Sequence, residues 1–410
     1  MGCPSVAGFG SCEIRFESLR LASAVEATSS EKDNDVIMSI LFGCSTALPP
    51  FSIEQGESAM LAQSLGLSRR WNKALPGLYK KSGVSRRGSV LLVSGSGEPM
   101  TRQGFYKTAS EHAPFGPTTG QRMQVYAQHA AELLRQSCEK TLAVSRVAVA
   151  AVTHLVTISC TGFYSPGVDH TLIDHLGLDT QVQRTHVGFM GCHGLLNGLR
   201  VANALSRSEP QGMVLVAAVE LCSIHQQYSE DPQQMVANSL FADGAASCLV
   251  VSREIQVDSN AARSGWTIAS SFSLKIDQSQ GMMGWVIGDH GFQMMLSPEV
   301  PLVIERELKG PFEKWLNSNQ LSQHDIQGWA VHPGGPRILD SVENGLGLSP
   351  TMIQASRHVL AHHGNMSSPT VFFVLQELEK EVPGMQNCVL LGFGPGLHVE
   401  AILLKRESVA

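Results

Sequence analysis

The chain has 410 residues, of which 43% are hydrophobic and 16% charged, and this apolar content is enough for a large buried core. Its formal net charge is −6 and no run of Lys and Arg stands out, which argues against nucleic acid or an anionic membrane surface as the main partner. The longest apolar runs, such as Val147–Val152, are far too short to span a bilayer.

Nine cysteines are scattered through the chain, at positions 3, 12, 44, 138, 160, 192, 222, 248 and 388. Their odd number and irregular spacing argue against a disulfide framework and indicate a reducing compartment. No Cys-x-x-Cys pair is present, so we expect no structural zinc site. The N-terminus also lacks a basic segment followed by an apolar stretch. We therefore expect a cytoplasmic protein.

Strands and helices are predicted to alternate along the chain. Residues 1–35 have weak periodicity and are expected to form a variable leader. Four segments follow with clear patterns: a strand at Val36–Leu41, an amphipathic helix at Glu54–Leu67, a long helix at Gly120–Ser145 and a strand covered on both faces at Ala148–Ser159. This alternation predicts α/β layers.

A weak internal repeat divides the rest of the chain. Each copy contains, in order, a strand, a loop, a helix, a glycine-containing turn, a second helix and a second strand. In the first copy the turn is Gly191-Cys192, the second helix Leu195–Leu205 and the last strand Met213–Val219; in the second they are Gly364-Asn365, a helix through Glu379 and Cys388–Leu391. Chance similarity is the alternative. If the repeat is real, 36–260 and 261–410 are two halves, and a pseudo-twofold axis brings Cys192 and Asn365 face to face.

Cys192 lies in the turn Gly188-Phe-Met-Gly-Cys-His-Gly, directly before a predicted helix. The flanking glycines permit a tight turn and the close approach of a thioester. A thiol at a helix N-terminus feels the positive end of the helix dipole, which favours the thiolate. A buried structural cysteine is the alternative, but the Gly-Cys-His-Gly turn at a helix start favours a nucleophile.

His332 ends the apolar strand Gly328–Val331 and is followed by Pro-Gly-Gly-Pro. A strand of this kind projects its last side chain into the crevice beyond the carboxyl ends of a sheet, and the glycines leave the ring uncovered. A neutral imidazole there can hydrogen-bond a carbonyl oxygen, and an imidazolium can pair with a thiolate.

Asn365 lies in His362-His-Gly-Asn-Met-Ser-Ser, at a second predicted helix start, where an N-cap is the alternative role. Its place in the repeat favours function, because an Asn amide and a His N–H aimed at one oxygen would form an oxyanion or enolate hole. Phe241 precedes a predicted tight bend at Asp243-Gly244, and the sequence leaves open whether it is a core aromatic or a site residue.

The five segments Gly191-Cys-His-Gly, Leu240-Phe-Ala-Asp-Gly-Ala, His332-Pro-Gly-Gly-Pro, His363-Gly-Asn-Met-Ser-Ser and Gly392-Phe-Gly-Pro-Gly-Leu resemble the signature set of chalcone-synthase-like type III polyketide synthases. Their order and approximate spacing agree with that family from Val36 to Leu404. The resemblance implies an α/β protein with the thiolase-like, five-layered αβαβα fold, built from two duplicated halves and normally a homodimer.

The resemblance also implies residue roles. Cys192 would hold the growing polyketide as a thioester, and His332 and Asn365 would assist decarboxylation of malonyl-CoA and stabilise the enolate. Phe241 would be the gatekeeper between a CoA tunnel and the cavity. The other implied site residues are Cys160, Thr161 and Ser367 in the cavity, Gly392, Phe393, Gly394 and Pro395 in the loop that shapes cyclisation, and Lys81, Arg86 and Arg87 near the CoA phosphates. For these basic residues, a solvated charged face is the alternative.

Glu220-Leu-Cys-Ser-Ile-His resembles the microbial branch of the family and places Cys222 and His225 in the cavity, with Trp285 and Met294 near other cavity positions. By resemblance, we expect a fatty acyl-CoA starter, malonyl-CoA as extender, and alkylpyrone or alkylresorcinol products. No metal or redox cofactor is expected, because the thioester and the loss of CO2 supply the driving force.

Three other functions remain as alternatives. A single-round β-ketoacyl synthase also uses Cys, His and Asn, although such enzymes typically show His-Gln-Ala-Asn where this chain has His-Pro-Gly-Gly-Pro. A cysteine hydrolase would release free acid without consuming malonyl-CoA. A catalytically silent thiolase-fold partner protein is the third, and the joint presence of Cys192, His332 and Asn365 argues against it.

Overall fold

The computed structural model describes residues 38–95, 99–209, 211–255 and 265–406. All of them belong to one compact unit, Ile37–Ala410. The expected leader, 1–35, and the expected boundary between the halves at residue 260 lie outside the described residues.

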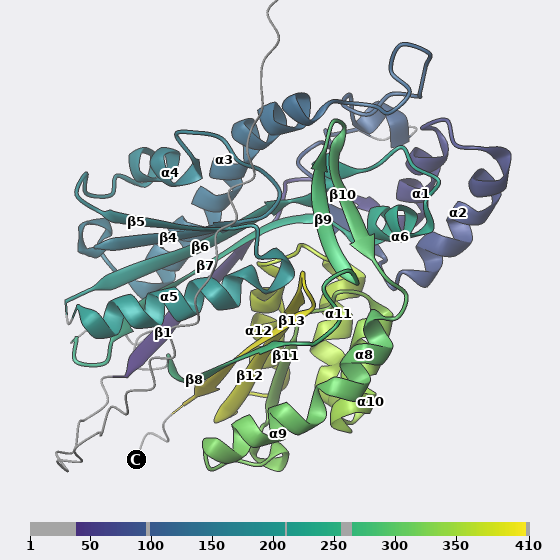
Figure 1. Ribbon diagram of the computed structural model, residues 1–410. Helices are drawn as coiled ribbons and strands as arrows, with labels where there is room; N and C mark the ends of the chain where they lie inside the picture. Colours follow the sequence, from purple (N-terminus) through teal and green to yellow (C-terminus); the bar gives the residue numbers. More distant parts are fainter. Residues whose placement is uncertain (1–37, 96–98, 210, 256–264, 407–410) are drawn as a thin grey trace, which may run out of the picture. The chain divides into compact units, whose positions relative to one another are not determined.

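Nine strands of the described chain form one sheet, in the order β11-β12-β13-β8-β1-β7-β6-β4-β5 (Figure 1). The strands of the first half are β1 (Ser39–Ala47), β4 (His154–Ser159), β5 (Gln183–Gly188), β6 (Met213–Leu221) and β7 (Asp243–Ser252). The strands of the second half are β8 (Trp266–Lys275), β11 (Gly328–Val331), β12 (Asn387–Gly394) and β13 (His398–Lys405).

Strand directions repeat between the two halves. In the first half, β4 and β6 are parallel, and β7 is antiparallel to both β6 and β1. In the second half, β11 and β12 are parallel, and β13 is antiparallel to both β12 and β8. The halves meet where β1 pairs with β8. The repeat predicted from the sequence is therefore a duplication of the sheet topology.

Two central helices and two outer groups of helices cover the sheet. The central helices are α5 (Gly194–Ser208) and α12 (Thr370–Glu381); the outer ones are α3 (Thr119–Ser145) and α4 (Val168–Leu176) on the first half, and α8 (Val300–Glu307), α9 (Lys309–Ser318) and α10 (Pro336–Leu346) on the second. Strand residues alternate between the layers: Val214 and Val216 join the central apolar cluster, whereas Leu215 packs under α3. The order of the layers is therefore helix, sheet, helix, sheet and helix, in which the two sheet layers are the two halves of the nine-stranded sheet. This is the order that the family resemblance implies.

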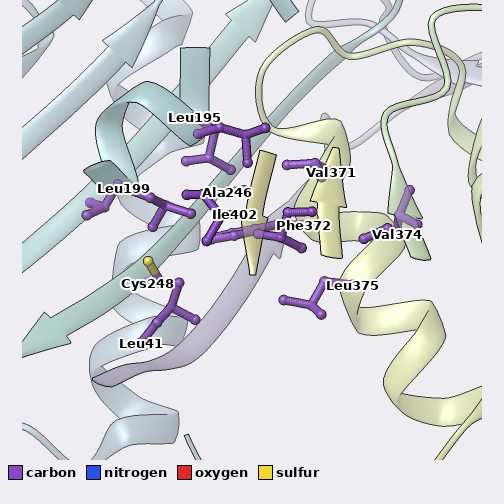
Figure 2. Packing of buried hydrophobic residues seen from close by; sticks show 14 of the residues in the cluster. Leu41, Leu195, Leu199, Ala246, Cys248, Val371, Phe372, Val374, Leu375 and Ile402 are labelled. Atoms are coloured by element: carbon purple, nitrogen blue, oxygen red, sulfur yellow. The ribbon is translucent and has the colours of Figure 1, made fainter. Parts of the chain in front are cut away.

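The central cluster joins side chains from both halves. Figure 2 shows Leu195 and Leu199 of α5 close to Val371 and Phe372 of α12, with Ile402 of β13 between them. All are at most 1% exposed. Because both helices bury an apolar face in the same cluster, the residues at their N-terminal ends are brought toward one another.

Smaller elements surround the end of the sheet where β4 and β6 finish. They are β2 (Ser52–Glu54), α1 (Gln55–Gln63), α2 (Arg69–Lys81), β3 (Arg86–Gly88), α6 (Pro232–Leu240), the hairpin β9 (Met283–Gly288) and β10 (Gly291–Leu296), and α11 (Gln354–His363). In Figure 1 the hairpin stands beside α6. No helix within the described ranges is long and apolar enough to cross a bilayer.

The predicted long helix is confirmed as α3, which begins with a capping box between Thr118 and Gln121. The predicted strand Ala148–Ser159 is only half right, because β4 begins at His154. Val149–Ala151 instead form a 3₁₀ turn, with the Ala151 N–H donating to the Ala148 carbonyl. The apolar residues of this stretch predict a strand, but the backbone here has to turn from the end of α3 into the sheet.

Phe372→Ala tests whether the central cluster stabilises the fold. The ring is fully buried, so we expect its loss to lower the free energy of unfolding by about 3–5 kcal/mol. Leu302→Ala, at a side chain that is 60% exposed in α8, is the control and should change it by less than about 0.5 kcal/mol. Urea denaturation followed by fluorescence measures both, and equal effects would contradict the assignment.

Candidate active site

Cys192 lies in a single turn of 3₁₀ helix, η3 (Gly191–His193), directly before α5. Gly191 has a φ of +75°, and a Cβ added to it would lie 2.5 Å from Pro395 Cδ. The Gly191 N–H donates to Sγ of Cys160 at 3.0 Å. The turn is therefore held between the residue after β4 and the residue after β12, and only glycine fits at position 191.

A largely apolar cavity opens in front of Cys192, with walls from α6, the β3 segment, the hairpin β9–β10 and the ends of β4 and β6. Most of the predicted cavity residues line it together with Cys192: Cys160, Thr161, Cys222, His225, Phe241, Trp285, Met294, Ser367, Gly394 and Pro395. Positions that are far apart in the sequence therefore converge on one space.

Gly392 and Phe393 do not line this cavity, contrary to the prediction for the glycine-rich loop. They belong to β12, in which successive side chains point to opposite faces. Phe393 is buried in the apolar cluster under α10, with Val331 and Leu339. Gly392 faces His193, whose Cβ would lie 3.1 Å from an added glycine Cβ.

Asn365 lies between the two motifs that carry the other predicted catalytic residues. Its Oδ1 accepts from the Ser367 N–H at 2.8 Å, and its Nδ2 donates to the Gly334 carbonyl at 3.5 Å. Its backbone pairs with α6 residues: the Asn365 N–H donates to the Leu240 carbonyl at 2.9 Å. Helix α12 begins only at Thr370, so the alternative role of Asn365 as an N-cap of that helix is wrong.

Burial and hydrogen bonding act in opposite directions on Cys192. Burial raises the pKa of its thiol to about 11, the nearby Glu220 carboxyl also raises the pKa, and hydrogen bonds from Ser367 and Asn365 lower it. The helix dipole favours the thiolate, as the sequence predicts, but the cost of desolvating the thiolate is larger than this effect. The Cys192 thiol is therefore protonated and needs a base when it reacts.

His332 follows β11 and is 1% exposed. The backbone N–H of His332 donates to the Leu391 carbonyl at 2.7 Å, and its backbone carbonyl accepts from the Gly334 N–H at 3.0 Å. Neither ring nitrogen has a hydrogen-bond partner among the described residues. Burial lowers the pKa of His332 to about 3, so the ring is a neutral imidazole with one donor and one acceptor to offer.

The hairpin wall of the cavity is fixed by His225. Its ring stacks on Phe292 at 4.0 Å between centroids, and Phe292 stacks on Trp285 at 5.0 Å. His225 Nε2 lies 2.6 Å from the Thr161 carbonyl, and Nδ1 accepts from the Phe292 N–H at 3.2 Å. His225 therefore links the loop after β4 to β10, and burial lowers its pKa to about 3.

Glu220 belongs to the site although its carboxyl was given no role in the sequence analysis. It is fully buried in β6 and accepts from the Cys160 N–H at 2.9 Å, the Thr161 hydroxyl at 2.8 Å and the Ser368 hydroxyl at 2.7 Å. Burial raises its pKa to about 7, and these hydrogen bonds oppose the rise. The signal that could have revealed it is a single carboxylate in the otherwise apolar run Met213–Leu221.

The basic cluster divides into exposed and buried members. Lys81 at the end of α2 and Arg86 in β3 are exposed. Arg87 is 8% exposed, and its guanidinium donates to the Ser58 hydroxyl and to the carbonyls of Asn238 and Phe241 at 2.6 and 2.9 Å. Four of its five N–H groups are thus used inside the protein, and Arg87 is better placed to hold Phe241 than to bind CoA phosphates.

A cysteine before one central helix and an asparagine before the other, in two duplicated α/β halves, are typical of thiolase-fold condensing enzymes. The chain superposes with a TM-score of 0.83 on PKS-I from the brown alga Ectocarpus siliculosus, with 27% identity and coverage of 92% of this chain and 100% of that one. The C-terminal type III polyketide synthase domain of Steely1 from Dictyostelium gives a TM-score of 0.81 with 25% identity, over 90% and 99% of the two chains. This class consists of acyltransferases that carry out Claisen condensations.

The sequence comparisons show the family. Residues 100–253 match the N-terminal domain and 268–408 the C-terminal domain of the chalcone and stilbene synthases. The alpha-pyrone synthesis polyketide synthase-like protein Pks18 of Mycobacterium tuberculosis is 29% identical over 369 residues, 89% of this chain and 91% of the relative. Type III polyketide synthase C of Arabidopsis thaliana is 30% identical over 316 residues, 75% and 81% of the two chains. The chain belongs to the type III polyketide synthase family, as the motifs predicted.

Replacing Arg87 and Arg86 separately tests the assignment of the basic cluster. Arg87→Met removes the charged donor to the Asn238 and Phe241 carbonyls, and we expect it to lower the free energy of unfolding by about 3 kcal/mol. Arg86→Met, at the exposed neighbouring position, should change it by less than about 0.5 kcal/mol. Urea denaturation measures both, and a stable Arg87→Met protein would return Arg87 to the ligand-binding candidates.

Proposed function

We propose that this chain is an iterative polyketide synthase that extends an acyl group, held as a thioester on Cys192, with two-carbon units from malonyl-CoA. The observation that carries the proposal is the position of Cys192, which lines the apolar cavity together with Ser367, whose backbone N–H donates to the side chain of Asn365. A nucleophile, hydrogen-bond donors and an apolar space therefore share one site, which is what acyl transfer requires.

Loading is the first proposed step. The Cys192 sulfur gives its proton to His332 and attacks the thioester carbonyl of an acyl-CoA. The bond between that carbonyl carbon and the CoA sulfur breaks, and CoA leaves as a thiol with the proton from His332. Because burial keeps the His332 ring neutral and its nitrogens have no partner among the described residues, one nitrogen is available to accept this proton.

Extension follows on the acylated enzyme. Malonyl-CoA loses CO2, and the electron pair of the broken C–C bond moves into the thioester as an enolate. The enolate oxygen accepts hydrogen bonds from His332 and from the Asn365 amide, which already lies next to the His332 turn through Gly334. The enolate carbon forms a bond to the carbonyl carbon of the acyl group while the bond from that carbon to the Cys192 sulfur breaks. The lengthened chain, now a thioester of CoA, returns to the sulfur in a second transfer that releases CoA as a thiol. The chemistry uses CoA thioesters as substrates and calls for no metal or redox cofactor.

We infer a fatty acyl-CoA starter and alkylpyrone or alkylresorcinol products. The cavity walls beyond Cys192 include apolar side chains such as Leu61, Leu92 and Met283, which suit a hydrocarbon chain. The relative Pks18 is named for alpha-pyrone synthesis, which agrees with the lactone product. Lys81 and Arg86 remain exposed beside the β3 wall and are the residues that we assign to the CoA phosphates.

We further infer that the chain acts as a homodimer in a reducing compartment such as the cytoplasm. Strand β5 is one of the two outer strands of the sheet in the described chain, and Phe163, Phe189 and Met190 near it are between 42% and 47% exposed. An apolar patch beside a free strand edge suits a twofold contact with a second copy. The seven cysteines in the described residues are all free thiols, which supports the compartment.

Two alternative activities would use the same cysteine but give different products. A single-round β-ketoacyl synthase would add one malonyl-derived unit and stop. A thioester hydrolase would release free acid from acyl-CoA without consuming malonyl-CoA. Mass spectrometry of the products formed from an acyl-CoA and isotopically labelled malonyl-CoA separates the three, because only the proposed enzyme makes a cyclised product with several labelled units.

Cys192→Ala tests the nucleophile in that assay. Without the sulfur no acyl-enzyme forms, so we expect no product above background and no mass increase of the protein with acyl-CoA. Cys44→Ala, at a half-buried free thiol in β1, is the control and should retain the product and the acyl adduct. Product formation by Cys192→Ala at the rate of the unaltered protein would eliminate the scheme.

Cys222→Phe tests whether the starter occupies the cavity. Cys222 is buried and lines the cavity, and the added ring would fill space needed by long chains. We expect kcat/KM for long acyl-CoA starters to fall by at least about tenfold relative to short ones, because discrimination in an apolar pocket costs roughly 1–3 kcal/mol per group. Cys222→Ala is the matched control and should keep the preference for long starters. An unchanged preference in Cys222→Phe would place the starter elsewhere.

A further inference from the structure

His193 follows the nucleophile directly and is buried against β12. Its side chain is 4% exposed, and its Nδ1 lies 2.7 Å from the Asn197 amide. The amide satisfies all of its neighbours in the orientation in which its nitrogen donates to Nδ1 at 2.7 Å and its oxygen accepts from Arg200 at 2.8 Å. Nδ1 is then an acceptor, so the proton of the neutral ring is on Nε2.

The Nε2–H group of His193 has no hydrogen-bond partner among the described residues. A buried donor without an acceptor lowers the stability of a folded protein. The backbone of β12 leaves space around the Nε2–H group of His193. A Cβ added to Gly392 would lie 3.1 Å from His193 Cβ, and one added to Gly394 would overlap the ring at Cδ2 and Nε2. The two glycines therefore open β12 at the place where the His193 ring lies.

His332 directly follows β11, the strand that pairs with β12, and β12 contains Gly392. Strand β11 pairs with β12 so that Ala330 is opposite Leu390, and both face the central cluster. His332, two residues further on, hydrogen-bonds through its N–H to the Leu391 carbonyl. The alternation of strand residues places His332 on the same face as Gly392, the residue that His193 covers. The two imidazoles therefore border the same space.

The ring of His332 needs a partner of the kind that His193 offers. Both of its nitrogens are unpartnered among the described residues, and a neutral imidazole that donates to a substrate oxygen through one nitrogen must accept at the other. Burial lowers the pKa of both histidines, and the nearby His193 further lowers that of His332. Both rings are consequently neutral, which is the state in which one can donate to the other.

We propose that the Nε2–H of His193 donates through one water molecule to one ring nitrogen of His332 and so favours, once Cys192 is acylated, the tautomer whose other N–H faces the substrate thioester. His193 is thus a positioning residue: it acts on the reaction through His332 and not by touching the substrate. Asn197 holds His193 in turn, and Arg200 holds Asn197 and forms an ion pair with the buried Glu400 at 3.1 Å. The proposal rests on the proposed role of His332 in decarboxylation.

The test measures decarboxylation of malonyl-CoA to acetyl-CoA, the step assigned to His332, by the purified full chain. His193→Phe fills the space but removes the donor, so we expect kcat to fall by about 10- to 100-fold with little change in KM. His193→Gln keeps an N–H donor near the position of Nε2 and should stay within about fivefold of the unaltered enzyme. His154→Phe, at a histidine that is 2% exposed at the far end of β4, is the matched control and should leave kcat unchanged.

A double-mutant cycle separates positioning from structural damage. In a His332→Gln background, where the ring to be positioned is absent, His193→Phe should lower the residual rate by less than about twofold. If His193→Phe does not fold, Asn197→Leu, which frees Nδ1, takes its place and should lower kcat by about threefold to tenfold.

Three outcomes overturn the inference: His193→Phe as active as the unaltered enzyme, His193→Gln as impaired as His193→Phe, or equal losses in the two backgrounds. An unaltered enzyme that does not decarboxylate malonyl-CoA at all would instead overturn the proposed function. The two failures are therefore distinguishable in one set of measurements.

Discussion

The apolar layer between the two halves is the constraint on which the site depends. Helices α5 and α12 bury their faces in one cluster with β13 and β7 (Figure 2), so neither helix can shift without exposing residues such as Leu199 and Phe372. The turns that precede these helices carry Cys192 and Asn365. Packing in the centre therefore sets the distance between a nucleophile and a hydrogen-bond donor that are far apart in the sequence, without any direct covalent or metal link.

The same burial decides the chemistry of the site. Removing water raises the pKa of Cys192 and lowers that of His332, because each charged form loses its hydration. Hydrogen bonds from Ser367 and Asn365 offset part of the cost at sulfur. Glu220 behaves similarly, with a raised pKa and three close donors around its carboxyl. Cys192 and His332 are therefore both neutral until a substrate supplies the charge that the donors of the site are arranged to meet.

Sequence reasoning located the parts of this protein whose signals are local. The buried strands are continuous apolar runs, the long helix has a helical period, and each motif contains its own glycines. The duplication was visible because both halves repeat strand, helix, turn and helix in the same order. The repeat by itself therefore predicts that Cys192 and Asn365 occupy equivalent positions in the two halves.

What the sequence did not reveal depends on neighbours in space. Arg87 and Arg86 are identical and adjacent, and only the packing of α6 against β3 makes one of them a buried brace. Phe393 was assigned to the cavity with its motif, but the period of a strand turns it to the opposite face. Glu220 was passed over because its partners come from other elements. In each case the residue type and the local sequence pattern fit both the role that the residue has in the structure and the role that it does not have.

Two glycine-containing motifs about half the chain apart prove to be one structural unit. The glycines of β12 and the loop after it suggest conformational freedom when seen in the sequence, and the family resemblance assigns them to cyclisation. In the structure, Gly392 and Gly394 have a different use: they lack the side chains that would collide with His193. Gly191, in the motif of Cys192, likewise lacks the side chain that would collide with Pro395. Each motif supplies the space into which the other projects, so a side chain added to either would move Cys192 relative to the wall of its own cavity.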